Sequence, residues 1–82
     1  MKMHLLRQKS EMTKTLILRE LLRTPRMKIK EIANCIGISF QAISAYLHQM
    51  HAEGLVSLIA KGEYILTPKG VQFLQEAVLD LQ

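Results

Sequence analysis

The chain has 82 residues, of which 49% are hydrophobic and 22% charged, and its formal net charge is +4. This balance excludes a disordered chain, and the length allows one small domain with too few residues for an enzyme's substrate cleft. No apolar run is long enough to span a bilayer and the N-terminus lacks a signal peptide, so we expect a single cytoplasmic domain over residues 1–82.

Charge is unevenly distributed along the chain. Residues 1–30 carry nine basic and two acidic side chains, a net of +7, whereas residues 31–82 carry two basic and five acidic ones, a net of −3. Such an asymmetry indicates a polyanionic partner, with a solvated basic face as the alternative. The single Cys35 cannot form an intrachain disulfide, in keeping with a reducing compartment.

The first half of the chain predicts two helices. Ser10 is the expected N-cap of a helix over 11–23, in which apolar residues recur at helical spacing. Thr24-Pro25 ends this helix, because proline lacks an amide donor and disfavours helical geometry in the residue before it. A short second helix over 31–36 is expected to end at Gly37.

The second half predicts a longer helix, a hairpin and a final helix. Ser39 caps a helix over 39–53, whose inward positions follow the i, i+4, i+7 rule: Ile43, Leu47 and Met50. Two β-rich runs within 56–66 flank a turn at Ala60-Lys61-Gly62. Thr67, followed by proline at the first helical position, opens a helix over 68–81. The fold class is therefore α+β, mainly α, with its core over residues 11–70.

The second helix, the glycine turn and the third helix fit a helix-turn-helix. Ala33 is small where the two helices approach each other, Gly37 lies four residues later, and Ile43 lies ten residues after Ala33. We expect the shared core to come from Ile29 or Ile32, Ile36, Ile38, Ile43 and a half-buried Tyr46.

These motifs stand in one order in the run IKEIANCIGISFQAISAYLHQMHAEGLVSLIAKGEYILTPKG. The run resembles winged helix-turn-helix transcriptional regulators of the MarR and ArsR kind, above all archaeal ones with QAVSEY in helix three and TPEGV opening the last helix. The resemblance covers roughly residues 11–80. It implies sequence-specific binding of double-stranded DNA, with helix 39–53 in the major groove and the wing, residues 56–66, on the backbone or minor groove. Many such archaeal regulators are longer and carry this domain at the N-terminus.

An uncharged, hydrogen-bonding surface is expected on helix three, opposite its inward positions. A glutamine amide reads adenine bidentately, hydroxyls donate or accept, and a methyl group touches thymine. The expected base contacts are Ser39, Gln41, Ser44, Ala45 and His48. An ordinary solvated polar stripe is the alternative. Phe40 is expected to pack against the turn as a hydrophobic staple, with an apolar base contact as the alternative.

Contacts to phosphate are expected from residues flanking helix three. Lys28 and Lys30 precede helix two, where the positive end of the helix dipole adds to their attraction, and Lys61 lies at the hairpin turn. For each, a solvated lysine is the alternative. The arginines Arg19, Arg23 and Arg26 are weaker candidates, because the first helix in such domains usually lies behind the reading surface.

The last helix carries an apolar stripe with spacings of three, four and three: Val71, Leu74, Val78 and Leu81. The stripe predicts a homodimer interface, with packing on the first helix of the same chain as the alternative; both hold if Phe73 and Ala77 face inward while part of the stripe pairs with a second copy. A dimer would place two reading helices about 34 Å apart, one turn of DNA, on a pseudo-palindromic site.

Other functions are disfavoured by spacing. Cys35, His48 and His51 lack the spacing of a metal site, and Cys35 is expected in or beside the core, so we expect no metal and no cofactor. No nucleophile and base stand at recognisable spacing, and no glycine-rich phosphate loop occurs, which argues against an enzyme. The main alternative to DNA binding is a protein-interaction module, since winged helices also serve as scaffolds.

Overall fold

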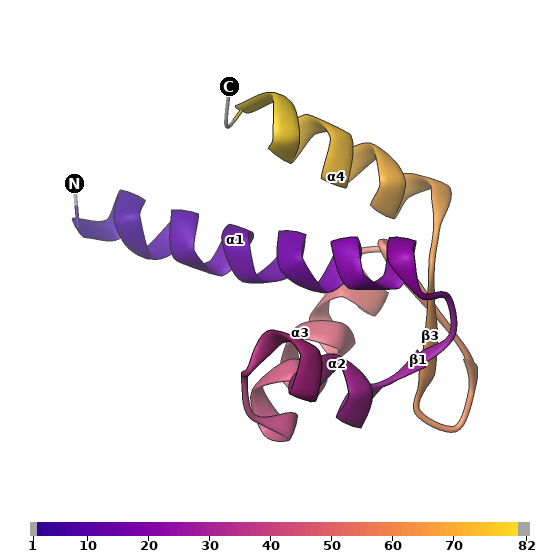
Figure 1. Cartoon of the computed structure of the whole chain (residues 1–82). Coiled ribbons are helices and arrows are strands. Elements are labelled where there is room, and N and C mark those ends of the chain that lie inside the picture. The colour runs from indigo at the N-terminus through magenta and orange to yellow at the C-terminus, as the bar shows by residue number, and fades with distance from the viewer. Residues whose placement is uncertain (1, 81–82) are drawn as a thin grey trace.

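Four helices and a three-stranded antiparallel sheet make up the part of the chain that the computed structural model describes, which is residues 2–80, with side chains over 11–77. The elements are α1 (Lys2–Arg23), β1 (Met27–Lys28), α2 (Ile29–Ile36), α3 (Phe40–Ala52), β2 (Val56–Ala60), β3 (Glu63–Leu66) and α4 (Pro68–Asp80). In Figure 1, α4 runs along one side of α1, and α2, α3 and the hairpin loop lie on the other. The expected mainly helical α+β architecture is confirmed.

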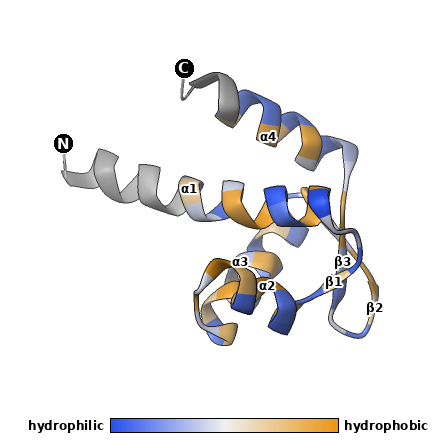
Figure 2. Cartoon of the chain, in the orientation of Figure 1, coloured by the Kyte–Doolittle hydropathy of each residue, from blue (hydrophilic) through white to orange (hydrophobic). Residues whose placement is uncertain are grey.

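The core lies where α1, α2, α3 and the sheet meet. Its fully buried side chains include Ile17, Leu18, Ile32, Ile43, Leu47 and Met50, each at 0% exposure. The three inward positions of α3 are therefore confirmed, and Ile29, Ile36, Ile38 and Tyr46 pack against this core as partly buried residues. Figure 2 shows the corresponding hydrophobic bands on α1, α3 and α4. No helix within residues 2–80 has the length and apolarity to cross a membrane.

The turn between α2 and α3 has the expected geometry. Gly37 has φ +79°, and its N–H donates to the Ala33 carbonyl at 2.8 Å. Ala33 is 8% exposed, so the helices approach closely at this small side chain. Ser39 caps α3, because its Oγ accepts the Ala42 N–H at 3.2 Å.

A short strand, β1, was absent from the sequence prediction. The sheet order is β1-β3-β2, and β1 pairs with β3 through Met27 opposite Tyr64 and Lys28 opposite Glu63. α2 follows directly and begins at Ile29, two residues earlier than predicted. β1 therefore joins the start of α2 to the wing.

The start of α4 is fastened to the end of α3 by Thr67. Its Oγ1 accepts the Gly70 N–H at 3.0 Å, as expected for an N-cap, and donates to the Gly54 carbonyl at 2.6 Å. Its own N–H donates to the Leu55 carbonyl at 3.2 Å. These bonds fix α4 relative to α3 and β2.

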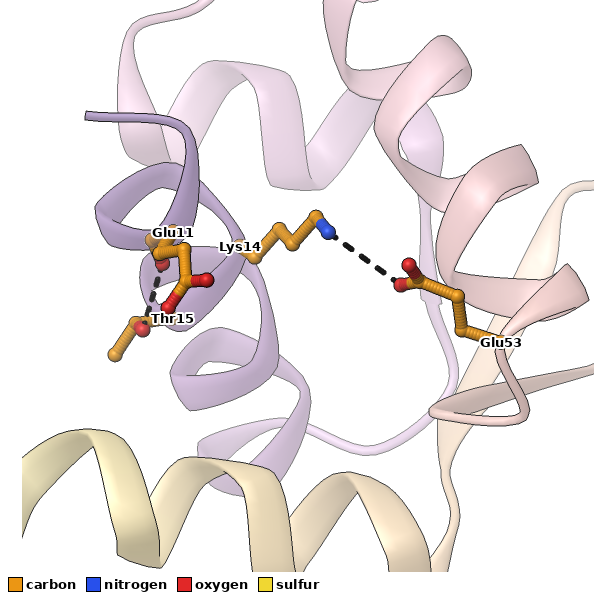
Figure 3. Close-up of polar contacts among 4 residues, drawn as sticks. All are labelled: Glu11, Lys14, Thr15 and Glu53. Carbon is orange, nitrogen blue, oxygen red and sulfur yellow. Dashed lines mark hydrogen bonds and ion pairs between the residues drawn. The ribbon is translucent and has the colours of Figure 1, made fainter. Parts of the chain in front are cut away.

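A second link joins α1 to the end of α3. Figure 3 shows Lys14 reaching from α1 to Glu53, with 3.4 Å between Nζ and Oε1. Beside it, the Thr15 Oγ1 donates to the Glu11 carbonyl one helical turn earlier, at 2.8 Å. The Lys14 side chain is only 12% exposed, so its aliphatic stem packs between the helices while its ammonium group reaches the carboxylate.

One prediction about α1 is wrong, and one alternative for α4 is favoured. Ser10 lies inside α1 instead of capping it, because the residues before it are mostly good helix formers that extend the helix back to Lys2. On α4, Leu74 is 6% exposed and belongs to the core of its own chain, as expected if part of the stripe packs within the chain. Val71 is partly buried, whereas Leu81 and the side chain of Val78 lie outside what the structure describes.

Candidate nucleic-acid interface

The outward face of α3 is opposite its buried residues. Gln41, Ala45 and His48 are exposed, and at 3.6 residues per turn they lie within roughly 60° of one another. Ser44 is partly exposed at one flank of this outer face, and the exposed Gln49 lies at the other. No lysine, arginine, aspartate or glutamate occurs between Ser39 and Gln49. The face offers hydrogen bonds and a methyl group without formal charge.

Ser39 already has a structural role. Its Oγ accepts the Ala42 N–H as the N-cap of α3, yet the side chain is exposed. A hydroxyl has one donor and two acceptor positions, so its proton remains available to a ligand. Ser39 is therefore able to cap the helix and contact a base at the same time.

Phe40 does not pack into the core. Its side chain is 53% exposed and is not among those packed against the core. Its ring lies in the first turn of α3, next to Gln41, and adds an apolar group to the end of this helix. This exposure leaves the ring available for the alternative, an apolar contact with a base.

Lys28, Lys30 and Lys61, which we call the lysine cluster, are brought together by the sheet. The Ile29 N–H donates to the Gly62 carbonyl at 3.3 Å, which places the start of α2 beside the hairpin turn. All three lysines are exposed. Residues more than thirty positions apart in the sequence thus lie at one edge of the molecule, on the side of α1 away from α4 (Figure 1).

Two glutamates beside the lysine cluster reduce its net positive charge. The Glu31 Oε1 accepts the Lys28 N–H at 3.0 Å, and Glu63 stands opposite Lys28 in the β1–β3 pair. Three lysines against two glutamates leave a local charge of +1. The cluster is suited to a few contacts with a polyanion, not to strong attraction at long range.

Sequence reasoning missed the contact that assembles the cluster. Strand β1 has only two residues, and its partner lies on β3, so no local periodicity marks it. The apolar Met27 between the basic Arg26 and Lys28 was the available signal in the sequence, since alternation of apolar and polar residues is typical of a strand.

Cys35 is exposed, contrary to the expectation that it lies in or beside the core. It lines an open concavity of about 250 Å³ between α1 and α2, together with Leu16, Arg19, Glu20, Arg23 and Ile36. His48 and His51 lie on α3 and are exposed. Within the described residues, no three His, Cys, Asp or Glu side chains gather in a way that could hold a metal ion.

Comparisons with known proteins match this architecture. A family model described as winged helix-turn-helix matches residues 7–78. An uncharacterized protein of Methanocaldococcus jannaschii is 34% identical over 76 residues, which are 92% of this chain and 29% of that protein.

Solved structures share the fold. A MarR family protein of Mycobacterium tuberculosis in complex with DNA has a TM-score of 0.73 and 23% identity, covering 80% of this chain and 51% of that one. The transcriptional repressor CouR, bound to p-coumaroyl-CoA, has a TM-score of 0.73 and 27% identity, covering 80% and 49%. The chain thus spans less than a third of the M. jannaschii protein and about half of each of these two structures.

Proposed function

The chain belongs to the winged helix-turn-helix family, and from this premise we propose that it binds double-stranded DNA sequence-specifically as a transcriptional regulator. One observation carries the proposal. The helix with the uncharged outer face, α3, and the elements that carry the lysine cluster, β1, α2 and the hairpin, lie on the side of α1 away from α4 (Figure 1). Base edges are read by hydrogen bonds and apolar contacts, whereas phosphates are bound by cations, and the two surfaces divide these tasks.

In this proposal α3 enters the major groove, which is wide enough to admit a helix. Gln41 pairs with adenine, and Ser39, Ser44 and His48 supply further hydrogen bonds to base edges. Ala45 contacts a thymine methyl group. The exposed ring of Phe40 adds an apolar contact at the start of the helix.

The lysine cluster binds the DNA backbone beside α3. Lys28 and Lys30 stand at the start of α2, where the helix dipole favours a phosphate, and Lys61 extends from the wing to the backbone or minor groove. The structurally similar M. tuberculosis protein forms a complex with DNA, which supports DNA binding by this fold. A cytoplasmic location follows from a DNA partner.

A homodimer through α4 is part of the proposal. Because Leu74 is buried in its own chain, the contacts with a second copy fall to Val71, Val78 and Leu81. Two reading helices related by a twofold axis would sit about 34 Å apart and bind a pseudo-palindromic site.

Titration onto a labelled random-sequence duplex at low salt, followed by fluorescence anisotropy, tests the proposal. We expect saturable binding that weakens as salt is added, because cations on the protein displace counterions from DNA. Selection from a randomised duplex pool should then enrich a defined sequence.

Failure to bind any duplex at low salt would refute DNA binding. It would favour the protein-interaction alternative, for which the uncharged face of α3 and the exposed Phe40 would form the contact surface. Binding without enrichment of any sequence would refute base reading alone.

A further inference from the structure

Arg26 has an unusual backbone conformation. Its φ is +66°, and among the described residues it is the only non-glycine with positive φ. The other positive-φ positions are Gly37, Gly54 and Gly62. A side chain in this left-handed region brings Cβ close to the following carbonyl, which costs free energy that glycine avoids.

The arginine therefore sits where glycine would fold more easily. Elsewhere the same chain uses glycine for this conformation, at the end of α2, after α3 and in the wing turn. Backbone strain that the fold itself does not require is a sign of function at that residue. The side chain of Arg26 is the feature that glycine would lack.

The surroundings of Arg26 point toward the lysine cluster. Met27, which follows it, is 5% exposed and anchors β1 in the core, whereas Arg26 and Lys28 on either side are exposed. Arg26 is a turn residue directly before β1, two positions from Lys28, so chain geometry keeps their Cα atoms within about 7 Å of each other. Arg26 thus places a further cation near Lys28, at the end of β1 that is away from the wing turn.

No hydrogen bond or ion pair engages the Arg26 side chain within the described part of the protein. Arg23, three residues earlier, is instead paired with Glu20 at 3.3 Å between Nη1 and Oε2. The Arg26 guanidinium is thus free to bind an external anion, and its planar fork of donors suits a phosphate.

We infer that Arg26 is a further phosphate-binding residue. It binds a DNA phosphate adjacent to the phosphate that Lys28 binds. The inference rests on the proposed DNA binding. It assigns to the α1–β1 connection a positioning role: its contact fixes the register of the backbone against α2 without reading sequence.

The test replaces Arg26 in the full chain and measures stability and DNA affinity together. Arg26→Gly relieves the strain, so we expect the Tm to rise by roughly 4 °C. The same variant should bind every duplex more weakly, and this loss of affinity should be about 8-fold larger at 0.1 M salt than at 1 M salt. The reason is that one lost phosphate contact changes the log–log salt slope by about 0.9, over a tenfold change in salt.

Two further variants serve as controls. Arg26→Asn also tolerates positive φ and removes the charge, so it should weaken binding as Arg26→Gly does. Arg23→Gln removes the same charge from a nearby side chain that is already paired with Glu20, and it should leave the salt slope nearly unchanged.

The outcomes separate the two proposals. If the unmodified protein binds no duplex, DNA binding fails and the inference fails with it. If the unmodified protein binds, but Arg26→Gly and Arg26→Asn keep its affinity and salt slope or match Arg23→Gln, the inference alone is overturned.

Discussion

Gln41 stands at the middle of the outer face of α3, beside Ala45 and His48 and opposite the buried Ile43. A glutamine there has both the acceptor and the donors that match the N6 and N7 edge of adenine. Its side chain makes no contact that the fold needs, which separates its effect on recognition from any effect on stability.

Replacing Gln41 with alanine should relax sequence preference. We expect a loss of about 1 to 3 kcal/mol on the preferred duplex and little change on unrelated duplexes, because only the matched base pair forms the bidentate contact. Anisotropy titrations on the selected duplex and on single-base variants measure this difference. Gln75→Ala, at an exposed position of α4, is the matched control. Equal losses on all duplexes would remove Gln41 from base reading.

Thr67 has a structural role that depends on a single atom, its hydroxyl oxygen. Its Oγ1 bonds to both the Gly70 N–H and the Gly54 carbonyl. Thr67→Val keeps the shape and removes both bonds, so we expect the free energy of unfolding to fall by about 1 to 2 kcal/mol. Urea denaturation measures the change. Thr67→Ser, which retains the hydroxyl, should recover most of it, and a Val variant as stable as the original would contradict this role.

At the scale of elements, the first turn of α4 packs against the backbone of the segment that enters β2. A Cβ at Gly70 would collide with the Leu55 carbonyl oxygen and lie 2.8 Å from the Leu66 Cδ1. Gly70 is therefore required by the close approach of two elements, although it sits within a helix, where alanine is normally favoured.

Gly70→Ala should destabilise the protein although helix propensity favours it by about 1 kcal/mol. We expect a loss of about 2 kcal/mol or more, because the backbone of α4 or of Leu55 must move to admit the methyl group. Gly37→Ala is the comparison: its Cβ would enter open space, so only the positive φ is penalised, by about 1 to 2 kcal/mol. Thermal unfolding of both variants gives the order. Stabilisation by Gly70→Ala would show that the elements do not approach so closely.

Elements marked by local chemistry were predictable from the sequence. Gly37, Ser39 and Thr67 act through bonds to residues no more than four positions away, apart from the bonds of Thr67 to Gly54 and Leu55. The inward positions of α3 follow helical spacing alone. The residues of the outer face were predictable for the same reason, since they are what remains opposite a buried stripe.

Elements defined by distant partners were not predictable. β1 exists because Met27 and Lys28 pair with β3, and a two-residue strand has no period of its own. The exposure of Phe40 and Cys35 and the burial of Leu74 likewise depend on how helices dock. Lys28 and Lys30 lie near Lys61 because β1 pairs with β3. The sequence therefore predicted these three lysines as phosphate contacts, but it did not predict that they lie close together.

At the scale of the whole molecule, we propose a different binding partner for each side of α1: a second copy of the chain on one side and DNA on the other. α4 lies on one side, with the stripe proposed for a second copy, and α2, α3 and the wing lie on the other. A twofold pairing through α4 would leave both DNA-binding surfaces free. This separation allows dimerisation and DNA binding to be tested independently.

Sedimentation at micromolar concentration tests the pairing. We expect the mass of a dimer, about twice the 9.4 kDa of the chain. Val71→Glu introduces a charge at a partly buried position of α4, and it should shift the protein toward the monomer. Gln75→Glu adds the same charge at an exposed position and should not. A monomer at these concentrations would contradict the dimer while leaving DNA contact by one domain intact.

The division of labour between an uncharged reading face and a separate lysine cluster is the central claim, and the salt dependence of DNA affinity tests it most directly. The variant with Lys28, Lys30 and Lys61 all replaced by alanine should have a log–log slope less steep by about 2.7, three contacts at 0.9 each, whereas Gln41→Ala should keep the original slope. An unchanged slope for the triple variant would contradict the claim. A slope for Gln41→Ala that becomes less steep, as the slope of the triple variant should, would contradict it as well.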